Sequence, residues 1–147
     1  MEIAVLALGC FWGPEIKFGK LEGITKTEVG YCGGNSDTTT YEKVCSGSTN
    51  HAEVVKLEFD PKKISYEKIL NYFFEIHDPT TLNSQGPDFG TQNRSEIFYL
   101  NDEQKNIAKK ITEKYNKRYS GKVVTKISQI KNYCIAEEYH QKYLEKR

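Results

Sequence analysis

The chain has 147 residues, 37% of them hydrophobic and 28% charged, so it is long enough to bury the core of one ordinary domain. Its net charge is +1 and its 18 lysines are spread along the chain, which argues against nucleic acid or a membrane as a partner. The start, MEIAVLALG, is too short an apolar run for a signal peptide or a membrane span, so we expect a cytoplasmic protein.

The first predicted elements are a strand and a helix that meet at Cys10. Residues 3–8 (IAVLAL) form a continuous apolar run typical of a buried strand, which Gly9 ends. A helix is predicted over about 11–20, where Pro14 falls in the first turn and is tolerated. Cys10 is therefore expected at a strand-to-helix junction.

The middle of the chain alternates strands, polar loops and a helix. Strands are predicted at 24–31 and 53–59, and the polar stretch between them, 35–53, is expected to be a long functional loop. Apolar residues at helical spacing predict a helix over 65–77, with Ser65 as its N-cap.

The last third continues the alternation and completes the predicted fold. We expect a polar loop at 78–95, a strand at 96–100, a helix from the cap Asn101 to about Tyr119, a strand at 123–130 and a terminal helix at 136–145. Helices interleaved with strands favour an α+β fold with two layers, and no linker or repeat divides residues 1–147, so we expect a single domain.

Four cysteines, Cys10, Cys32, Cys45 and Cys134, are expected to be free thiols in the reducing cytoplasm. Their spacing contains no C-x-x-C, so no metal site is predicted. Cys10 has the most distinctive placement, because a helix N-terminus stabilises a thiolate and lowers its pKa from about 8.5 by one to several units. The alternative is a buried cysteine that packs as a small hydrophobe.

Four neighbours bear on the chemistry of Cys10. Phe11 and Trp12 indicate either an apolar pocket beside a nucleophile or ordinary core packing. His51, in a polar loop, is a candidate base. Glu53 begins an apolar strand, where burial would raise the pKa of its carboxyl and let it act as an acid near neutral pH. The alternative for Glu53 is an ordinary carboxylate at a strand edge.

Five segments together resemble the peptide methionine sulfoxide reductase A family. They are GCFWG at 9–13, GYCGG at 30–34, TYEKVCSGSTNHAEVV at 40–55, HDPTTLNSQGPDFGTQNRS at 77–95 and AEEYHQKYLEK at 136–146. The resemblance covers nearly the whole chain in order. It implies a ferredoxin-like two-layer α/β sandwich with a mixed sheet, no cofactor, and reduction of the S epimer of methionine sulfoxide, free or in proteins.

The resemblance also implies a role for each site residue. Cys10 would attack the sulfoxide sulfur and become a sulfenic acid, while protonated Glu53 polarises the oxygen. Tyr41 would donate a hydrogen bond to that oxygen, and Asp88 would help to organise substrate and water. The remaining assignments are an apolar wall for the S-methyl group, formed by Phe11 and Trp12, and a structural role for His51.

Two departures from the family pattern concern the site and its regeneration. Position 93 is Asn93 where the family has a second tyrosine, which predicts a modest rate loss that Asn93→Tyr would restore. The C-terminal tail with resolving cysteines is expected to be lacking, so an external thiol would reduce the Cys10 sulfenic acid. Glutaredoxin with glutathione is the first candidate and thioredoxin the second. Whether Cys32, Cys45 or Cys134 could resolve it stays open, and a monomer is expected.

Two other functions fit some of the same residues. A cysteine acyl-transferase or hydrolase would use Cys10 with His51 and would lose its activity in His51→Ala. A methionine-sulfoxide-binding module would use Phe11 and Trp12 as a reader pocket and would bind without turnover. The reductase hypothesis instead predicts tolerance of change at His51 and severe loss in Glu53→Ala.

Overall fold

The computed structural model describes residues 1–146, which fold around one six-stranded sheet with the strand order β7-β6-β1-β3-β2-β8. Its strands are β1 (Glu2–Leu8), β2 (Ile24–Cys32), β3 (Ala52–Phe59), β6 (Ser95–Tyr99), β7 (Lys126–Gln129) and β8 (Cys134–Ile135). A separate two-stranded hairpin pairs β4 (Ser84–Gln85) with β5 (Asp88–Phe89). The helices are α1 (Trp12–Gly19), α2 (Tyr41–Cys45), α3 (Tyr66–Glu75), α4 (Asp102–Arg118) and the 3₁₀ turns Thr91–Asn93 and Glu138–His140.

The four central strands have the ferredoxin-like arrangement. Along the chain β1-α1-β2 is followed by β3-α3-β6, and the order β6-β1-β3-β2 is antiparallel at every step. β7 adds a parallel strand beside β6, and β8 pairs antiparallel with the end of β2. The predicted α+β fold with a mixed sheet is therefore confirmed.

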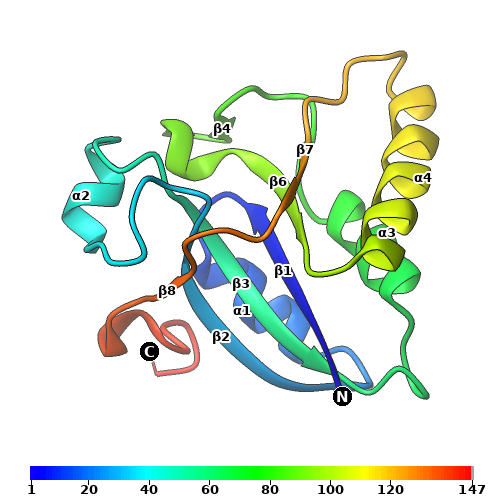
Figure 1. Cartoon of the computed structure of the whole chain (residues 1–147), viewed down its shortest axis with the longest axis horizontal. Coiled ribbons are helices and arrows are strands. Elements are labelled where there is room, and N and C mark those ends of the chain that lie inside the picture. Colours follow the sequence, from blue (N-terminus) through cyan, green and yellow to red (C-terminus); the bar gives the residue numbers. More distant parts are fainter. Residues whose placement is uncertain (147) are drawn as a thin grey trace.

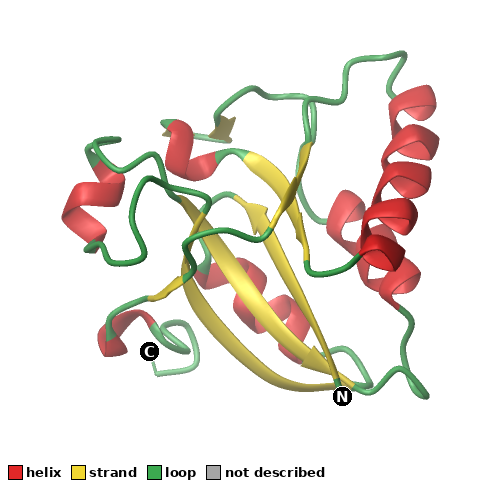
Figure 2. Cartoon of the chain, viewed as in Figure 1, coloured by secondary structure: helices red, strands yellow, loops and turns green. Residues whose placement is uncertain are grey.

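Alternation along the central strands divides the core between the two faces of the sheet. Ala4, Leu6 and Leu8 of β1 pack with α1, α3 and α4, whereas Val5 and Ala7 belong to a cluster on the opposite face. Figure 1 shows α1 behind the sheet and the chain after α4 crossing in front of it. That crossing segment is loop and short strand rather than helix (Figure 2). The helical layer therefore covers one face only, and β1 is buried on both sides.

Two predicted helix starts are confirmed by their caps. The Ser65 side chain accepts a hydrogen bond from the Lys68 N–H at 3.0 Å, and the Asn101 side chain accepts one from the Gln104 N–H at 2.8 Å. A polar cap of this kind contributes about 1 kcal/mol. No helix of residues 1–146 is long and apolar enough to cross a membrane.

The predicted terminal helix over 136–145 is wrong. Only the 3₁₀ turn Glu138–His140 forms there, and Lys142 has a positive φ of 51°. The side chain of Gln141 explains the difference, because its oxygen accepts a hydrogen bond from the Val29 N–H and its nitrogen donates one to the Val29 carbonyl, each at 2.9 Å. The segment pairs with the edge of β2 through this side chain, so tertiary contacts override its helical pattern.

The two predicted loops also contain short regular elements. Helix α2 lies inside the polar stretch 35–53, with Thr40 as its cap, and the β4–β5 hairpin and a 3₁₀ turn lie inside 78–95. None of these elements exceeds five residues, which is too short for periodicity to reveal. Both loops converge on the end of β1.

Candidate active site

The end of β1 and the start of α1 place Cys10 at the predicted junction. Gly9 has φ +100°, which turns the chain out of the strand, and a Cβ at Gly9 would lie 2.9 Å from the Gln85 side chain. A side chain at this position would therefore collide with the β4–β5 hairpin. The glycine brings hairpin and nucleophile together, and Cys10 immediately precedes Phe11, the N-cap residue of α1.

Cys10 opens into a cavity of about 250 Å³. This cavity gathers five of the six predicted site residues from distant parts of the chain: Cys10, Trp12, Tyr41, Glu53 and Asp88. Asn93, the position that departs from the family pattern, lines it as well. A cavity of similar volume, about 260 Å³, lies along β2 and the C-terminal segment and contains none of these side chains.

Glu53 is the buried carboxyl of the cavity. It is 4% exposed near the start of β3, and one of its oxygens accepts a hydrogen bond from the Phe11 N–H at 3.4 Å. The pKa of Glu53 is raised to about 7, chiefly by burial and also by the charge of Asp88, while the hydrogen bond from that N–H lowers it. The predicted rise in pKa is therefore present, and the carboxyl keeps its acid form up to near neutral pH.

The predicted fall in the pKa of Cys10 is wrong. Burial raises the pKa of the Cys10 thiol to about 11, and the charges of Glu53 and Asp88 add to the rise. The Trp12 N–H at the helix start lowers the pKa, as expected, but by less than burial raises it. The resting site therefore holds a thiol rather than a thiolate.

Tyr41 begins α2 and is held by Glu137 of the C-terminal segment. One Glu137 oxygen accepts a hydrogen bond from the Tyr41 N–H at 3.0 Å, and the other accepts one from the buried Tyr31 hydroxyl at 2.8 Å. Burial and a hydrogen bond with the Cys45 thiol raise the pKa of Tyr41, so its phenol keeps its proton and can donate it to an acceptor in the cavity.

Trp12 forms the aromatic wall of the cavity and is fixed by the C-terminal segment. Its indole N–H donates a hydrogen bond to Nδ1 of His140 at 3.1 Å, and its ring stacks on Tyr143 with centroids 3.8 Å apart. Phe11 does not line the cavity. Its ring is 1% exposed and packs in a core cluster against which Trp12 and Tyr41 rest. Phe11 thus backs the wall rather than presenting a surface of its own.

Sequence reasoning missed His140 and Glu137 as supports of the site. His140 is 1% exposed, and its ring lies 4.4 Å from that of Tyr41 as well as contacting Trp12. Both residues lie in the AEEYHQKYLEK segment, whose likeness to the family was noted without a role for either side chain. No local pattern could have paired them with residues almost 100 or more positions away.

Asp88 and Asn93 belong to the hairpin side of the cavity. Asp88 is exposed in β5, and its charge raises the pKa of both Glu53 and Cys10. Asn93 is 5% exposed, and its side-chain nitrogen donates a hydrogen bond to the Phe89 carbonyl at 3.3 Å. Asn93 therefore holds the end of the hairpin to the 3₁₀ turn that follows it.

The other predicted candidates lie apart from the cavity, with one exception. His51 is fully buried and its Nε2 bonds to the Ser36 carbonyl at 2.8 Å, which fits the structural role predicted for it. Cys32 is buried on the opposite face of the sheet, and Cys134 lies in β8. Cys45 is the exception, because it lines the same cavity as Cys10. Within residues 1–146 no cluster of three His, Cys, Asp or Glu side chains could hold a metal ion.

Comparisons with known proteins agree on one family. The model of the family described as peptide methionine sulfoxide reductase matches residues 2–147. The chain is 77% identical to peptide methionine sulfoxide reductase MsrA of Pelagibacter ubique (strain HTCC1062), over the full length of both. It superposes with a TM-score of 0.94 on reduced Mxr1 from Saccharomyces cerevisiae, at 42% identity and covering 99% of this chain and 85% of that one. Mxr1 in complex with Trx2 gives a TM-score of 0.69 at 29% identity, covering 97% and 84%.

Proposed function

The chain belongs to the peptide methionine sulfoxide reductase A family, and we propose that it reduces the S epimer of methionine sulfoxide, free or in proteins, to methionine. It is an oxidoreductase of this type, as its relatives are. The observation that carries the proposed mechanism is the single cavity in which Cys10, Glu53, Tyr41 and Trp12 meet. We assign the catalytic roles to Cys10, Glu53, Tyr41 and Asp88 and the substrate wall to Trp12, backed by Phe11.

The first step transfers the sulfoxide oxygen to Cys10. The Cys10 sulfur forms a bond to the electrophilic sulfoxide sulfur, while the Glu53 carboxylic acid gives its proton to the sulfoxide oxygen and the thiol proton returns to Glu53. The oxygen then passes to the Cys10 sulfur as the bond between oxygen and substrate sulfur breaks, and the bond between the two sulfur atoms breaks with it. Methionine leaves, and Cys10 is oxidised to a sulfenic acid by two electrons. No net proton is taken up or released.

Protonation explains why Glu53 and Tyr41 suit this oxygen. A carboxyl whose pKa lies near 7 retains a useful fraction of its acid form at neutral pH, which is the condition for general acid catalysis. The Tyr41 phenol, with its pKa raised, donates a hydrogen bond without ionising. Asp88, exposed at the mouth, would orient the polar part of the substrate and its water, while Trp12 faces the apolar S-methyl group.

An external thiol completes the cycle in our proposal. The thiol attacks the sulfenic sulfur, water leaves, and a second thiol reduces the resulting mixed disulfide. The yeast relative Mxr1 forms a complex with Trx2, which supports a thioredoxin as reductant; glutathione with glutaredoxin is the alternative. The free state of all four cysteines supports a reducing, cytoplasmic setting, and we propose that a monomer of one catalytic domain suffices.

A dithiothreitol-coupled assay with the separate S and R epimers of methionine sulfoxide tests the function. We expect turnover of the S epimer only, loss of activity in Cys10→Ser, and unchanged activity in Cys134→Ser. Equal turnover of both epimers, or activity that survives in Cys10→Ser, would contradict the proposal.

Mass spectrometry after one equivalent of substrate tests the cycle. We expect a Cys10 sulfenic acid that dimedone traps. Loss of two hydrogens with a cross-linked peptide that joins Cys10 to Cys45, the other cysteine of the cavity, would show an internal resolving thiol instead of an external one.

A further inference from the structure

Phe89 is an exposed aromatic residue at the cavity that holds Cys10. It is 76% exposed, more than any of the other large hydrophobic residues that are exposed in residues 1–146. Among those exposed residues, Phe89 is the one that lines the cavity. A single exposed apolar side chain is ordinary on a protein surface. Phe89 differs from the others by its position, because it lines the cavity of Cys10 and also extends into solvent, where a bound substrate would meet it.

The backbone around Phe89 is fixed, so its exposure is built into the fold. Phe89 pairs with Ser84 across the β4–β5 hairpin, and its carbonyl accepts a hydrogen bond from buried Asn93. The next residue, Gly90, has φ +122°, and a Cβ there would lie 2.3 Å from the Gln92 side chain. The φ of Gly90 is one that other residues rarely adopt, and this turn fixes the direction in which the chain leaves Phe89.

The other strand of the hairpin is anchored beside Gly9, which precedes the nucleophile, and to the loop after α3. The Gln85 side chain packs against Gly9 and hydrogen-bonds to both the N–H and the carbonyl of Asp78. The hairpin thus cannot move away from Cys10 without breaking these contacts. A contact made by Phe89 costs little conformational entropy in its backbone, which favours its use as an anchor.

We propose that Phe89 binds an apolar side chain that neighbours methionine sulfoxide in a polypeptide substrate, and so sets sequence preference around the oxidised residue. This inference rests on the proposed function and deepens it. Trp12 and Tyr41 serve the sulfoxide group itself within the cavity, whereas Phe89 extends the same surface toward solvent, where the substrate main chain must continue. Free methionine sulfoxide has no neighbour to place there.

The test compares two acetylated pentapeptides in which methionine S-sulfoxide is flanked on both sides by leucine or by glycine. Dithiothreitol is the reductant, so that no protein reductant competes for the surface. We expect the wild-type ratio of kcat/KM, leucine-flanked over glycine-flanked, to be about tenfold, as for the burial of one aromatic contact. Phe89→Ala should bring that ratio to about one, chiefly through KM, and Phe89→Leu should retain most of it.

Leu82→Ala is the matched control, because Leu82 is 66% exposed in the same part of the chain but does not line the cavity. Its ratio should equal that of the wild type. An equal loss for both peptides in Phe89→Ala would show a merely structural role and overturn the proposal, as would a wild-type ratio of one. A defect that appears only with thioredoxin as reductant would assign Phe89 to the reductant instead. Failure of the proposed function differs from all of these, since neither peptide would then be reduced.

Discussion

Replacing Glu53 by glutamine is predicted to stabilise the protein above pH 7 while removing most of its activity. Glu53 is 4% exposed, and burial raises the pKa of its carboxyl from an ordinary 4.5 to about 7. The folded protein therefore opposes ionisation of this group. Glutamine has a similar shape, carries no proton that can be lost, and can still accept the hydrogen bond from the Phe11 N–H.

The direction and size of this stabilisation follow from the linkage between protonation and folding. Between pH 4.5 and about pH 7 the folded protein holds a proton on Glu53 that the unfolded chain has already lost, so the free energy of unfolding falls as pH rises. The full rise in pKa corresponds to about 3 kcal/mol. At pH 8 Glu53→Gln should be more stable than the wild type by an amount of this order, and at pH 4 the two should be close.

Urea unfolding at pH 4 and pH 8, followed by fluorescence of the single tryptophan, measures the effect. Glu96→Gln is the control, because Glu96 is also buried but is paired with Arg94 at 2.7 Å. It should lose about 3 kcal/mol or more, since the arginine is left without its partner. The same change from glutamate to glutamine is thus expected to raise the free energy of unfolding at position 53 and to lower it at position 96.

Activity completes the test of Glu53. Loss of a general acid lowers turnover by about 10²- to 10⁴-fold, so kcat of Glu53→Gln should fall at least a hundredfold in the dithiothreitol assay. The reasoning is refuted if the gap in stability between wild type and variant is the same at pH 4 and pH 8, or if the variant turns over at the wild-type rate.

The remaining predictions concern the nucleophile, the aromatic wall and the hairpin. Iodoacetamide should alkylate Cys10 slowly in the resting enzyme, at a rate that mass spectrometry measures and that rises tenfold per pH unit up to about pH 11. An alkylation rate that is already constant near pH 7 would show a thiolate instead. His140→Phe should raise KM severalfold and shift the tryptophan emission, because the Trp12 indole N–H loses its hydrogen-bond acceptor at a cost of about 1 kcal/mol. His140→Asn should restore part of the KM and part of the emission shift. A KM and an emission in His140→Phe that equal those of the wild type would contradict this. Asn93→Ala should speed proteolytic cleavage of the 83–90 hairpin and raise KM, since the bond to the Phe89 carbonyl is lost; an unchanged cleavage rate would count against a tethering role.

Local patterns predicted the elements whose stability is decided within a few residues. The apolar run of β1 and the polar caps Ser65 and Asn101 were readable because a buried strand and an N-cap have short-range signatures. The junction at Cys10 followed from these rules, and so did the buried carboxyl of Glu53. The family likeness supplied Tyr41 and Asp88, whose local context is only that of polar loops.

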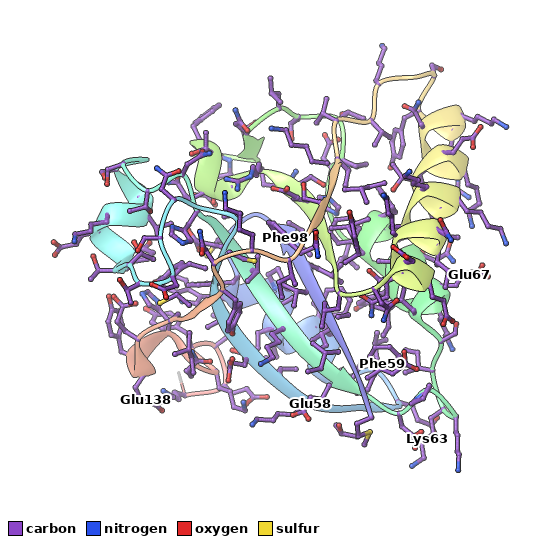
Figure 3. The ribbon with its side chains drawn as sticks, viewed as in Figure 1. Glu58, Phe59, Lys63, Glu67, Phe98 and Glu138 are labelled. Carbon is purple, nitrogen blue, oxygen red and sulfur yellow. The ribbon has the colours of Figure 1, made fainter. Side chains whose placement is uncertain are left out.

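The sequence predictions failed where contacts between residues far apart in the chain decide the local structure. The segment after residue 136 carries a helical pattern but packs against the edge of β2 instead, where the Gln141 side chain forms hydrogen bonds with both the N–H and the carbonyl of Val29. Trp12 owes its place to His140, 128 residues away along the chain. In Figure 3, which draws the side chains as sticks on the ribbon, Phe98 lies deep within the fold and Glu138 at its periphery, and sequence pattern alone does not separate such environments.

The pKa of Cys10 is raised where the sequence predicted that it would fall, and this changes the expected chemistry. A helix start alone would favour a thiolate, but the cavity also contains a carboxyl, and each anion would raise the pKa of the other group. Burial disfavours both charges, so the resting pair of Cys10 and Glu53 is neutral up to about pH 7. In the proposed reaction the sulfoxide oxygen must gain a proton and the Cys10 sulfur must lose one. A neutral pair can carry out both proton transfers without creating a buried charge. In the mechanism that we propose, the sulfur of Cys10 becomes strongly nucleophilic only while substrate is present to receive its proton through Glu53.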